Sequence, residues 1–109
     1  MNANLTLQRQ GSPILLLAHL HQTMPGLPAA SFHVSPVTPD TLEISLHNSL
    51  DAFTAWREAL RLGVPEAKGH NGSSWLVVDG VIDDVPVKLT GFGAAADVAA
   101  YVAPVGVAA

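Results

Sequence analysis

Two stretches of the chain place apolar residues at helical spacing, and the first lies near the N-terminus. Residues 12–23 carry apolar side chains around more than one stripe of a helix, so we expect this helix to be covered on two sides. Ser12 can cap its first turn, and Pro13 suits the first helical position. The helix is expected to end at Thr23, because Met24-Pro25-Gly26 cannot continue it.

The second helical stretch has a narrower apolar stripe. Its apolar positions, three or four residues apart, are Leu50, Phe53, Trp56 and Leu60. Asn48 or Ser49 can cap the first turn, and Gly63 stops the helix. The stripe predicts that Trp56 is buried between this helix and a sheet.

Residues 31–47 alternate apolar and polar side chains in two short runs, a pattern typical of strands with one buried face. The apolar positions are Phe32, Val34, Leu42, Ile44 and Leu46. The polar positions, expected to share the opposite face, are Ser31, His33, Ser35, Glu43, Ser45 and His47. Residues 37–40 contain turn formers, so the two runs are predicted to form a hairpin.

A second hairpin is predicted from about Ser73 to Phe92, with a two-residue turn at Asp83-Asp84. The pairs in this register are Ile82 with Val85, Asp79 with Lys88 as an ion pair, Val78 with Leu89, and Trp75 with Phe92. Pro86 has no N–H to donate. The last strand is therefore expected at an edge of the sheet, or with its proline on an unpaired side.

The order helix, hairpin, helix, hairpin predicts an α+β fold for a single domain of residues 1–109. We expect a two-layer sandwich in which a four-stranded antiparallel sheet carries both helices on one face. Residues 1–10, which alternate weakly from Asn4 onward, can add a fifth strand at an edge. Residues 66–72 are interpreted as a flexible connector. The alanine-rich segment is expected to form a short helix to Tyr101, with residues 104–109 frayed.

Three short segments of the chain, "LEISLH", "FTAWREAL" and "VPVKLTGF", loosely resemble segments of other proteins. They are similar to phrases in short, uncharacterised, Ala-rich proteins of high-GC actinobacteria. No activity is attached to that group of proteins. The resemblance therefore implies a source and implies no function.

Composition narrows the classes of function. The chain has 109 residues, of which 49% are hydrophobic and 13% charged, so it can form a core. Its net charge is −4, and its five Lys and Arg residues are scattered, which argues against nucleic acid as a partner. It has no cysteine and no apolar run of the ~20 residues that a membrane span needs. These features, with no signal peptide in view, lead us to expect a cytoplasmic protein without disulfides or cofactor.

The polar face of the first hairpin holds the ingredients of nucleophilic catalysis. Depending on register, Glu43 faces either His33 or Ser35, so a serine, a histidine and a carboxylate can lie close together. The chain has no glycine-flanked nucleophile motif, however, and a flat sheet face offers no pocket. We therefore favour an ordinary solvated face and a non-catalytic protein. The alternative is a small-ligand or metal-binding protein, or a small hydrolase-like enzyme, that uses Ser31, His33, Glu43, Ser45 and His47.

Metal binding is disfavoured by the spacing of the five histidines. His19 and His21 diverge on their helix, and only one register makes His33 and His47 diagonal neighbours. Two imidazoles are fewer ligands than a structural zinc site normally has. We expect no metal.

The excess of apolar residues over what the predicted fold can cover is more informative about function than the polar face or the histidines. The first helix and the second hairpin present more hydrophobic surface than two helices on one sheet face can cover. Residues 1–10 or the C-terminal alanine-rich segment can fold over this surface. Apolar surface that stays uncovered marks an interface with another chain. We expect a homodimer, or a complex with another protein, with contacts drawn from Leu15, Leu16, Trp75, Val77, Val81 and Phe92.

Overall fold

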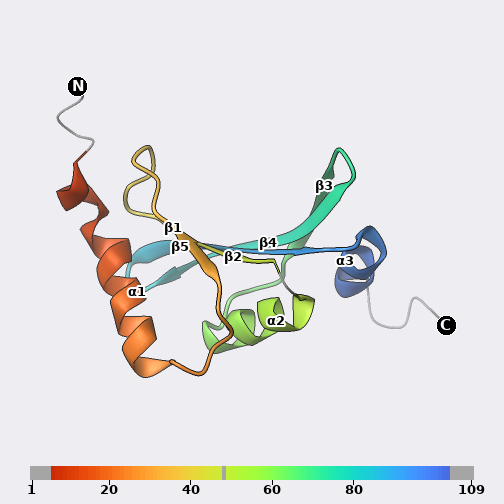
Figure 1. Ribbon diagram of the computed structural model, residues 1–109, viewed down its shortest axis with the longest axis horizontal. Coiled ribbons are helices and arrows are strands. Elements are labelled where there is room, and N and C mark those ends of the chain that lie inside the picture. The colour runs from red at the N-terminus through yellow and green to blue at the C-terminus, as the bar shows by residue number, and fades with distance from the viewer. Residues whose placement is uncertain (1–5, 48, 104–109) are drawn as a thin grey trace.

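The computed structural model describes residues 6–47 and 49–103, which form an α+β fold with a five-stranded mixed open sheet and three α-helices (Figure 1). The helical elements are the 3-10 helix η1 (Leu7–Gln10), α1 (Gly11–Thr23), α2 (Leu50–Ala59) and α3 (Ala95–Val102). The strands are β1 (Ser31–His33), β2 (Leu42–Leu46), β3 (Glu66–His70), β4 (Ser73–Ile82) and β5 (Val85–Gly93). Their order across the sheet is β1-β2-β5-β4-β3.

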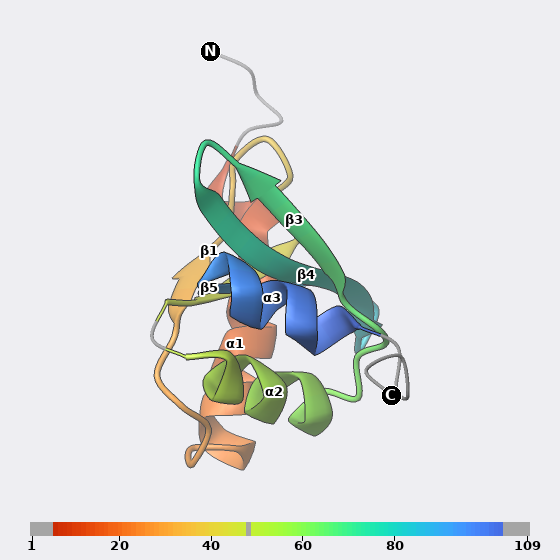
Figure 2. The same ribbon diagram turned by 90° about the vertical axis from the view of Figure 1, so that its right-hand side faces the viewer.

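All three α-helices lie on the same side of the sheet (Figures 1 and 2). Helix α1 contacts β2 and β5, and α2 crosses beneath the same two strands. Helix α3 contacts β3, β4 and β5. The sequence predicted two helices on one face of a four-stranded sheet and a further short helix in the alanine-rich segment, to Tyr101. Helix α3 confirms that short helix and lies on the same face as the other two. None of the helices that the structure describes is long and apolar enough to cross a membrane.

The expectation of a wholly antiparallel sheet is wrong at its centre. β2 and β5 run parallel, with Leu42 opposite Val87 and Leu46 opposite Gly91. Helix α2 carries the chain beneath the sheet to the far edge, and the β4–β5 hairpin then returns with β5 beside β2. β5 is therefore a central strand. Pro86 is accommodated because the ladder with β2 begins one residue later, at Val87.

The predicted connector at residues 66–72 is wrong as well, because Glu66–His70 forms the edge strand β3. It pairs with β4 through a two-residue turn at Asn71 and Gly72, whose φ angles are 50° and 82°. Positive φ at both turn positions is the geometry of a type I′ hairpin, which favours Asn-Gly. Every residue of β3 is exposed, so the strand lacks the alternation by which we identified the others.

The N-terminal region also differs from the expectation. Leu7–Gln10 forms a 3-10 helix that leads into α1, rather than part of an edge strand. The Gln10 side chain donates a hydrogen bond to the carbonyl oxygen of Val34 at 2.9 Å, which ties this segment to the end of β1. Residues 1–5 and the segment expected to fray, 104–109, lie outside the described residues.

Several local predictions are confirmed. The β4–β5 register matches the predicted pairs, and Asp83 and Asp84 adopt φ angles of 50° and 66° in the two-residue turn. The Ser49 side chain caps α2 by accepting a hydrogen bond from the backbone N–H of Ala52 at 3.1 Å. Asn48, the other candidate cap, is outside the described residues.

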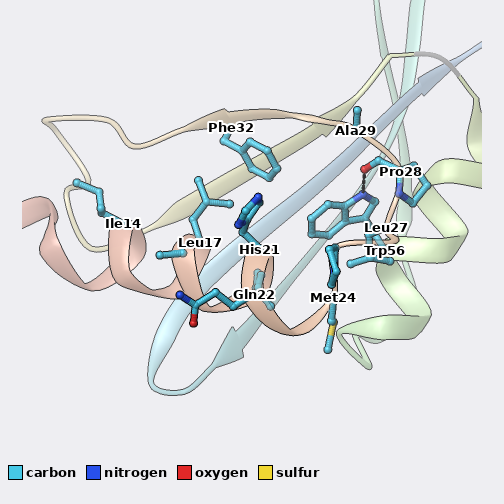
Figure 3. A pocket seen from close by; sticks show the side chains of 13 residues that line it. Ile14, Leu17, His21, Gln22, Met24, Leu27, Pro28, Ala29, Phe32 and Trp56 are labelled. Atoms are coloured by element: carbon cyan, nitrogen blue, oxygen red, sulfur yellow. Dashed lines mark hydrogen bonds between the residues drawn. The ribbon is translucent and has the colours of Figure 1, made fainter.

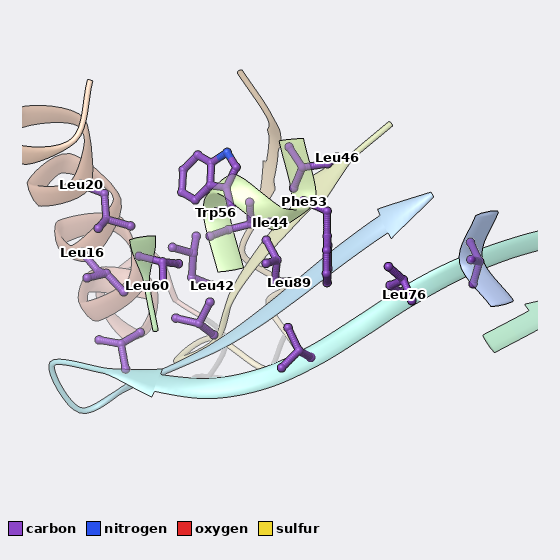
Figure 4. Close-up of a cluster of buried hydrophobic side chains, with 14 residues drawn as sticks. Leu16, Leu20, Leu42, Ile44, Leu46, Phe53, Trp56, Leu60, Leu76 and Leu89 are labelled. Atoms are coloured by element: carbon purple, nitrogen blue, oxygen red, sulfur yellow. The ribbon is translucent and has the colours of Figure 1, made fainter. Parts of the chain in front are cut away.

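The core lies between the sheet and the helices (Figure 4). Phe53 of α2 lies directly beneath Gly91 of β5, where an added Cβ would come within 2.7 Å of the ring. Trp56 is 4% exposed, as its place on the α2 stripe predicted, and its indole N–H donates to the carbonyl oxygen of Pro28 at 2.8 Å. Tyr101 joins α3 to this core through edge-to-face contact with Phe53 at 5.7 Å.

Candidate functional site: the open face of the sheet

The side of the sheet opposite the helices is covered by no element of the described chain, and we call it the open face (Figure 1). Its side chains follow from the strand registers, since alternate residues point to the same side. They are Ser31 and His33 of β1, Glu43 and Ser45 of β2, Pro86, Lys88, Thr90 and Phe92 of β5, Ser73, Trp75, Val77, Asp79 and Val81 of β4, and Glu66, Lys68 and His70 of β3. His47, one residue beyond β2, joins them by stacking on Phe92.

An aromatic row crosses this face. The rings of His47 and Phe92 stack with centroids 4.8 Å apart, and the centroid of Phe92 lies 6.0 Å from that of Trp75. Lys68 lies opposite Trp75 on the next strand. Phe92 and Trp75 are half-buried because each ring covers part of its neighbour. The predicted aromatic pair is thus part of a longer row that begins on His47.

A charged row runs parallel to the aromatic one. Glu43, Lys88 and Asp79 are direct neighbours on β2, β5 and β4, with the lysine between the two carboxylates. The predicted pairing of Asp79 with Lys88 is therefore correct in register. Within residues 6–47 and 49–103, however, the ion pair that forms is between Lys68 and Glu66, whose charged atoms are 3.6 Å apart.

Between these rows the open face is hollowed. A shallow depression of about 410 Å³ is lined by Trp75, Val77 and Lys88 together with residues of β3. Its walls include the acids Glu66 and Asp79. The depression makes the face uneven, which gives a protein partner a shape to match.

The serine, histidine and glutamate positions are brought only partly together. His33 lies opposite Glu43, and Ser31 lies opposite Ser45, so the first hairpin adopts one of the two registers considered from the sequence. His47 lies one residue beyond the end of β2 and stacks on Phe92. The diagonal placement of His33 and His47 that a shared metal required is therefore not adopted. In the described part of the chain, no three His, Asp or Glu residues are grouped so that they could hold a metal ion.

The predicted interface residues differ widely in accessibility. Leu15 and Val81 are 71% and 65% exposed, and Trp75 and Phe92 are half-buried. Leu16 faces the core at 4% exposed, so it has no surface to offer a partner in this conformation. Val77 is 7% exposed although it points to the open face, because it is in the middle of the sheet, between Thr90 and Glu66.

A second feature, an apolar groove on the helical side, was not anticipated from the sequence. It lies between the inner side of α1 and the segment that leads into β1, with Trp56 at one end (Figure 3). Residues Ile14, Leu17, Ala18 and His21 line one wall at helical spacing. The wide apolar surface of the first helix indicated that something packs on it. The sequence pattern did not show that a groove separates α1 from the segment that leads into β1.

Comparison of the chain with protein-family models, with curated proteins and with solved structures gives no match.

Proposed function

We propose that this protein is a non-catalytic interaction module that pairs with a second copy of itself through the open face. The observation that carries the proposal is that all three α-helices lie on one side of the sheet, while the aromatic row and Val81 lie on the other. A sheet face with exposed apolar groups is stabilised when something packs on it.

The aromatic row supplies suitable anchors for such a contact. Trp and Phe bury large areas at small conformational cost, and aromatic residues are enriched at the centres of interfaces. The stacking of His47 on Phe92, with Trp75 next in line, holds the row in place before a partner arrives. Less ordering is then required on association.

Charge favours a second copy as the occupant. The open face carries three carboxylates (Glu43, Glu66 and Asp79) and two lysines (Lys68 and Lys88), a net charge of −1. A strongly acidic or basic partner would leave one sign unmatched. Two copies related by a two-fold axis can instead place each Lys88 against a carboxylate of the other copy.

The charges also set a limit on affinity. Lys88 and Asp79 are exposed near the middle of the face, and they must lose water when the face is covered. We therefore expect a weak dimer, with a dissociation constant in the micromolar range. A constant of tens of micromolar corresponds to about −6 to −7 kcal/mol.

Sedimentation velocity over a range of concentrations tests the proposal. The wild-type protein should show a dimer that Trp75→Asp and Phe92→Asp each weaken. Val37→Asp is the control, because Val37 is an exposed valine in the loop between β1 and β2 and is not one of the strand side chains that form the open face. A wild-type protein that stays monomeric at tens of micromolar would overturn the proposal, as would equal weakening by Val37→Asp.

A further inference from the structure

We propose that the groove between α1 and Trp56 is a binding site for a small, uncharged, largely apolar molecule. The groove has a volume of about 540 Å³, within the range of roughly 300–1,000 Å³ that small-molecule sites occupy. It lies on the helical side of the sheet, so this inference does not depend on the proposed dimer (Figure 3).

Charge defines the class of ligand. None of the residues that line the groove is Asp, Glu, Lys or Arg. The lining side chains with polar atoms that can hydrogen bond are His21, Gln22 and Trp56. An anion or a cation that bound against these walls would give up part of its hydration without gaining a counter-charge. An uncharged ligand loses much less.

The walls are in place before a ligand binds. The ring of Trp56 is buried, and its N–H is already bonded to the Pro28 carbonyl oxygen at 2.8 Å. Phe32 meets Trp56 edge to face, with ring centroids 5.9 Å apart. The Trp56 end therefore presents an apolar surface whose indole N–H already has an acceptor. Met24, at the end of α1, adds a flexible side chain that can adapt to the ligand.

One polar contact is available inside the groove. His21 lines the groove from α1 and is exposed, so its ring is accessible to a ligand. Its ring nitrogens can exchange a hydrogen bond with a single hydroxyl or carbonyl group of a ligand. This arrangement suits a molecule with an apolar body and one neutral polar group.

The shape of the groove favours a small molecule over a segment of another protein. The chain from Met24 to Ala30 joins α1 to β1 and runs around the Trp56 end of the groove (Figure 3). An extended peptide or a helix that passed along α1 would meet this segment. A short ligand fits within the space that it bounds.

The experiment uses three probes with the same apolar body: 1-octanol, octanoate and octylammonium. Binding is followed by ¹H–¹⁵N NMR through the indole N–H of Trp56, which gives a signal separate from that of Trp75. We expect saturable shifts with octanol and affinity lower by about tenfold or more for both ions, because the groove offers them no counter-charge. No saturable shift, or equal affinity for the three probes, would overturn the proposal.

Matched variants locate the site. Ala18→Phe fills the groove from α1 and should abolish octanol binding, whereas Ala100→Phe places the same ring on an exposed position of α3 and should leave it unchanged. Ala29→Phe blocks the opposite wall and replaces Ala18→Phe if that variant does not fold. Octanol binding that survives both groove variants would contradict the assignment.

Two further results separate this site from the proposed dimer. Phe92→Asp should leave the octanol affinity unchanged, because Phe92 lies on the open face. If Ala18→Phe abolishes self-association, and the wild-type protein shows no octanol shift, then the groove is occupied by a second copy and the small-molecule site is refuted.

Discussion

The imidazole ring of His47 stacks on the phenyl ring of Phe92, with centroids 4.8 Å apart and ring planes 6° from parallel. This contact joins the end of β2 to the end of β5 and begins the aromatic row of the open face. The sequence favoured an ordinary solvated face for His47, with a metal ligand or a member of a serine-histidine-glutamate site as the alternatives. The structure instead shows it as a packing partner of an aromatic side chain.

Because only His47, of the pair His33 and His47 on the open face, is stacked in this way, replacing it should affect stability more than replacing His33. His47→Gln should lower the free energy of unfolding by about 0.5–1 kcal/mol, because an aromatic stack is lost. His33→Gln should stay within about 0.5 kcal/mol of the wild type, since His33 is exposed, lies beside Glu43 and stacks on no aromatic ring of the described residues. Urea denaturation of both variants measures the difference. Equal effects would show that the stack contributes nothing.

Trp56 should be a sensitive position on α2. Trp56→Ala removes a buried ring and is expected to cost about 3–5 kcal/mol. Trp56→Phe keeps most of the packing but removes the donor to the Pro28 carbonyl oxygen, so it should cost less, about 1–2 kcal/mol. Denaturation can be followed by the fluorescence of Trp75, which both variants retain. A Trp56→Ala variant with wild-type stability would mean that the α2 stripe does not face the sheet.

Gly91 should tolerate no side chain while Phe53 remains. In Gly91→Ala the new methyl group would lie 2.7 Å from the Phe53 ring, and the overpacking is expected to cost about 1–3 kcal/mol. Gly11→Ala is the control, because nothing lies within 4 Å of an added Cβ there and the backbone is already helical. That change should be neutral or stabilise the protein by up to about 1 kcal/mol. The thermal stability of the two variants can be compared by calorimetry. A Gly91→Ala protein as stable as Gly11→Ala would contradict the close packing of Gly91 on Phe53.

The turn between β3 and β4 offers a local test of the edge strand. Gly72 has a φ of +82°, so Gly72→Ala should strain the turn by about 1–2 kcal/mol. Because β3 is an exposed edge strand, the strain should appear as faster amide hydrogen exchange in β3 and the start of β4. Exchange in β2 should not change. Unaltered protection of β3 would show that this turn does not hold the strand in place.

The predictions that succeeded from sequence rest on strong local patterns. The stripe of Leu50, Phe53 and Trp56 specified α2 and its buried side, and the alternation around Asp83-Asp84 specified the β4–β5 register. Each depends on residues close together in the chain.

The features that the sequence did not predict either lack a local pattern or depend on contacts between residues far apart in the chain. β3 has no buried residue, so only its Asn71-Gly72 turn marked it as half of a hairpin. The parallel pairing of β2 with β5 is fixed by how α2 crosses beneath the sheet, which neither strand encodes alone. The groove at Trp56 arises where three separate segments meet, so no single stretch of sequence predicts it.

The most direct test of the central claim is an isotope-filtered NOE experiment on a mixture of ¹³C-labelled and unlabelled protein, at a concentration well above the dimer dissociation constant. We predict intermolecular NOEs that involve the rings of Trp75 and Phe92 and the methyl groups of Val81. Intermolecular NOEs confined to Leu15 and its neighbours on α1, or no intermolecular NOEs at all, would contradict the assignment of the open face as the surface through which two copies associate.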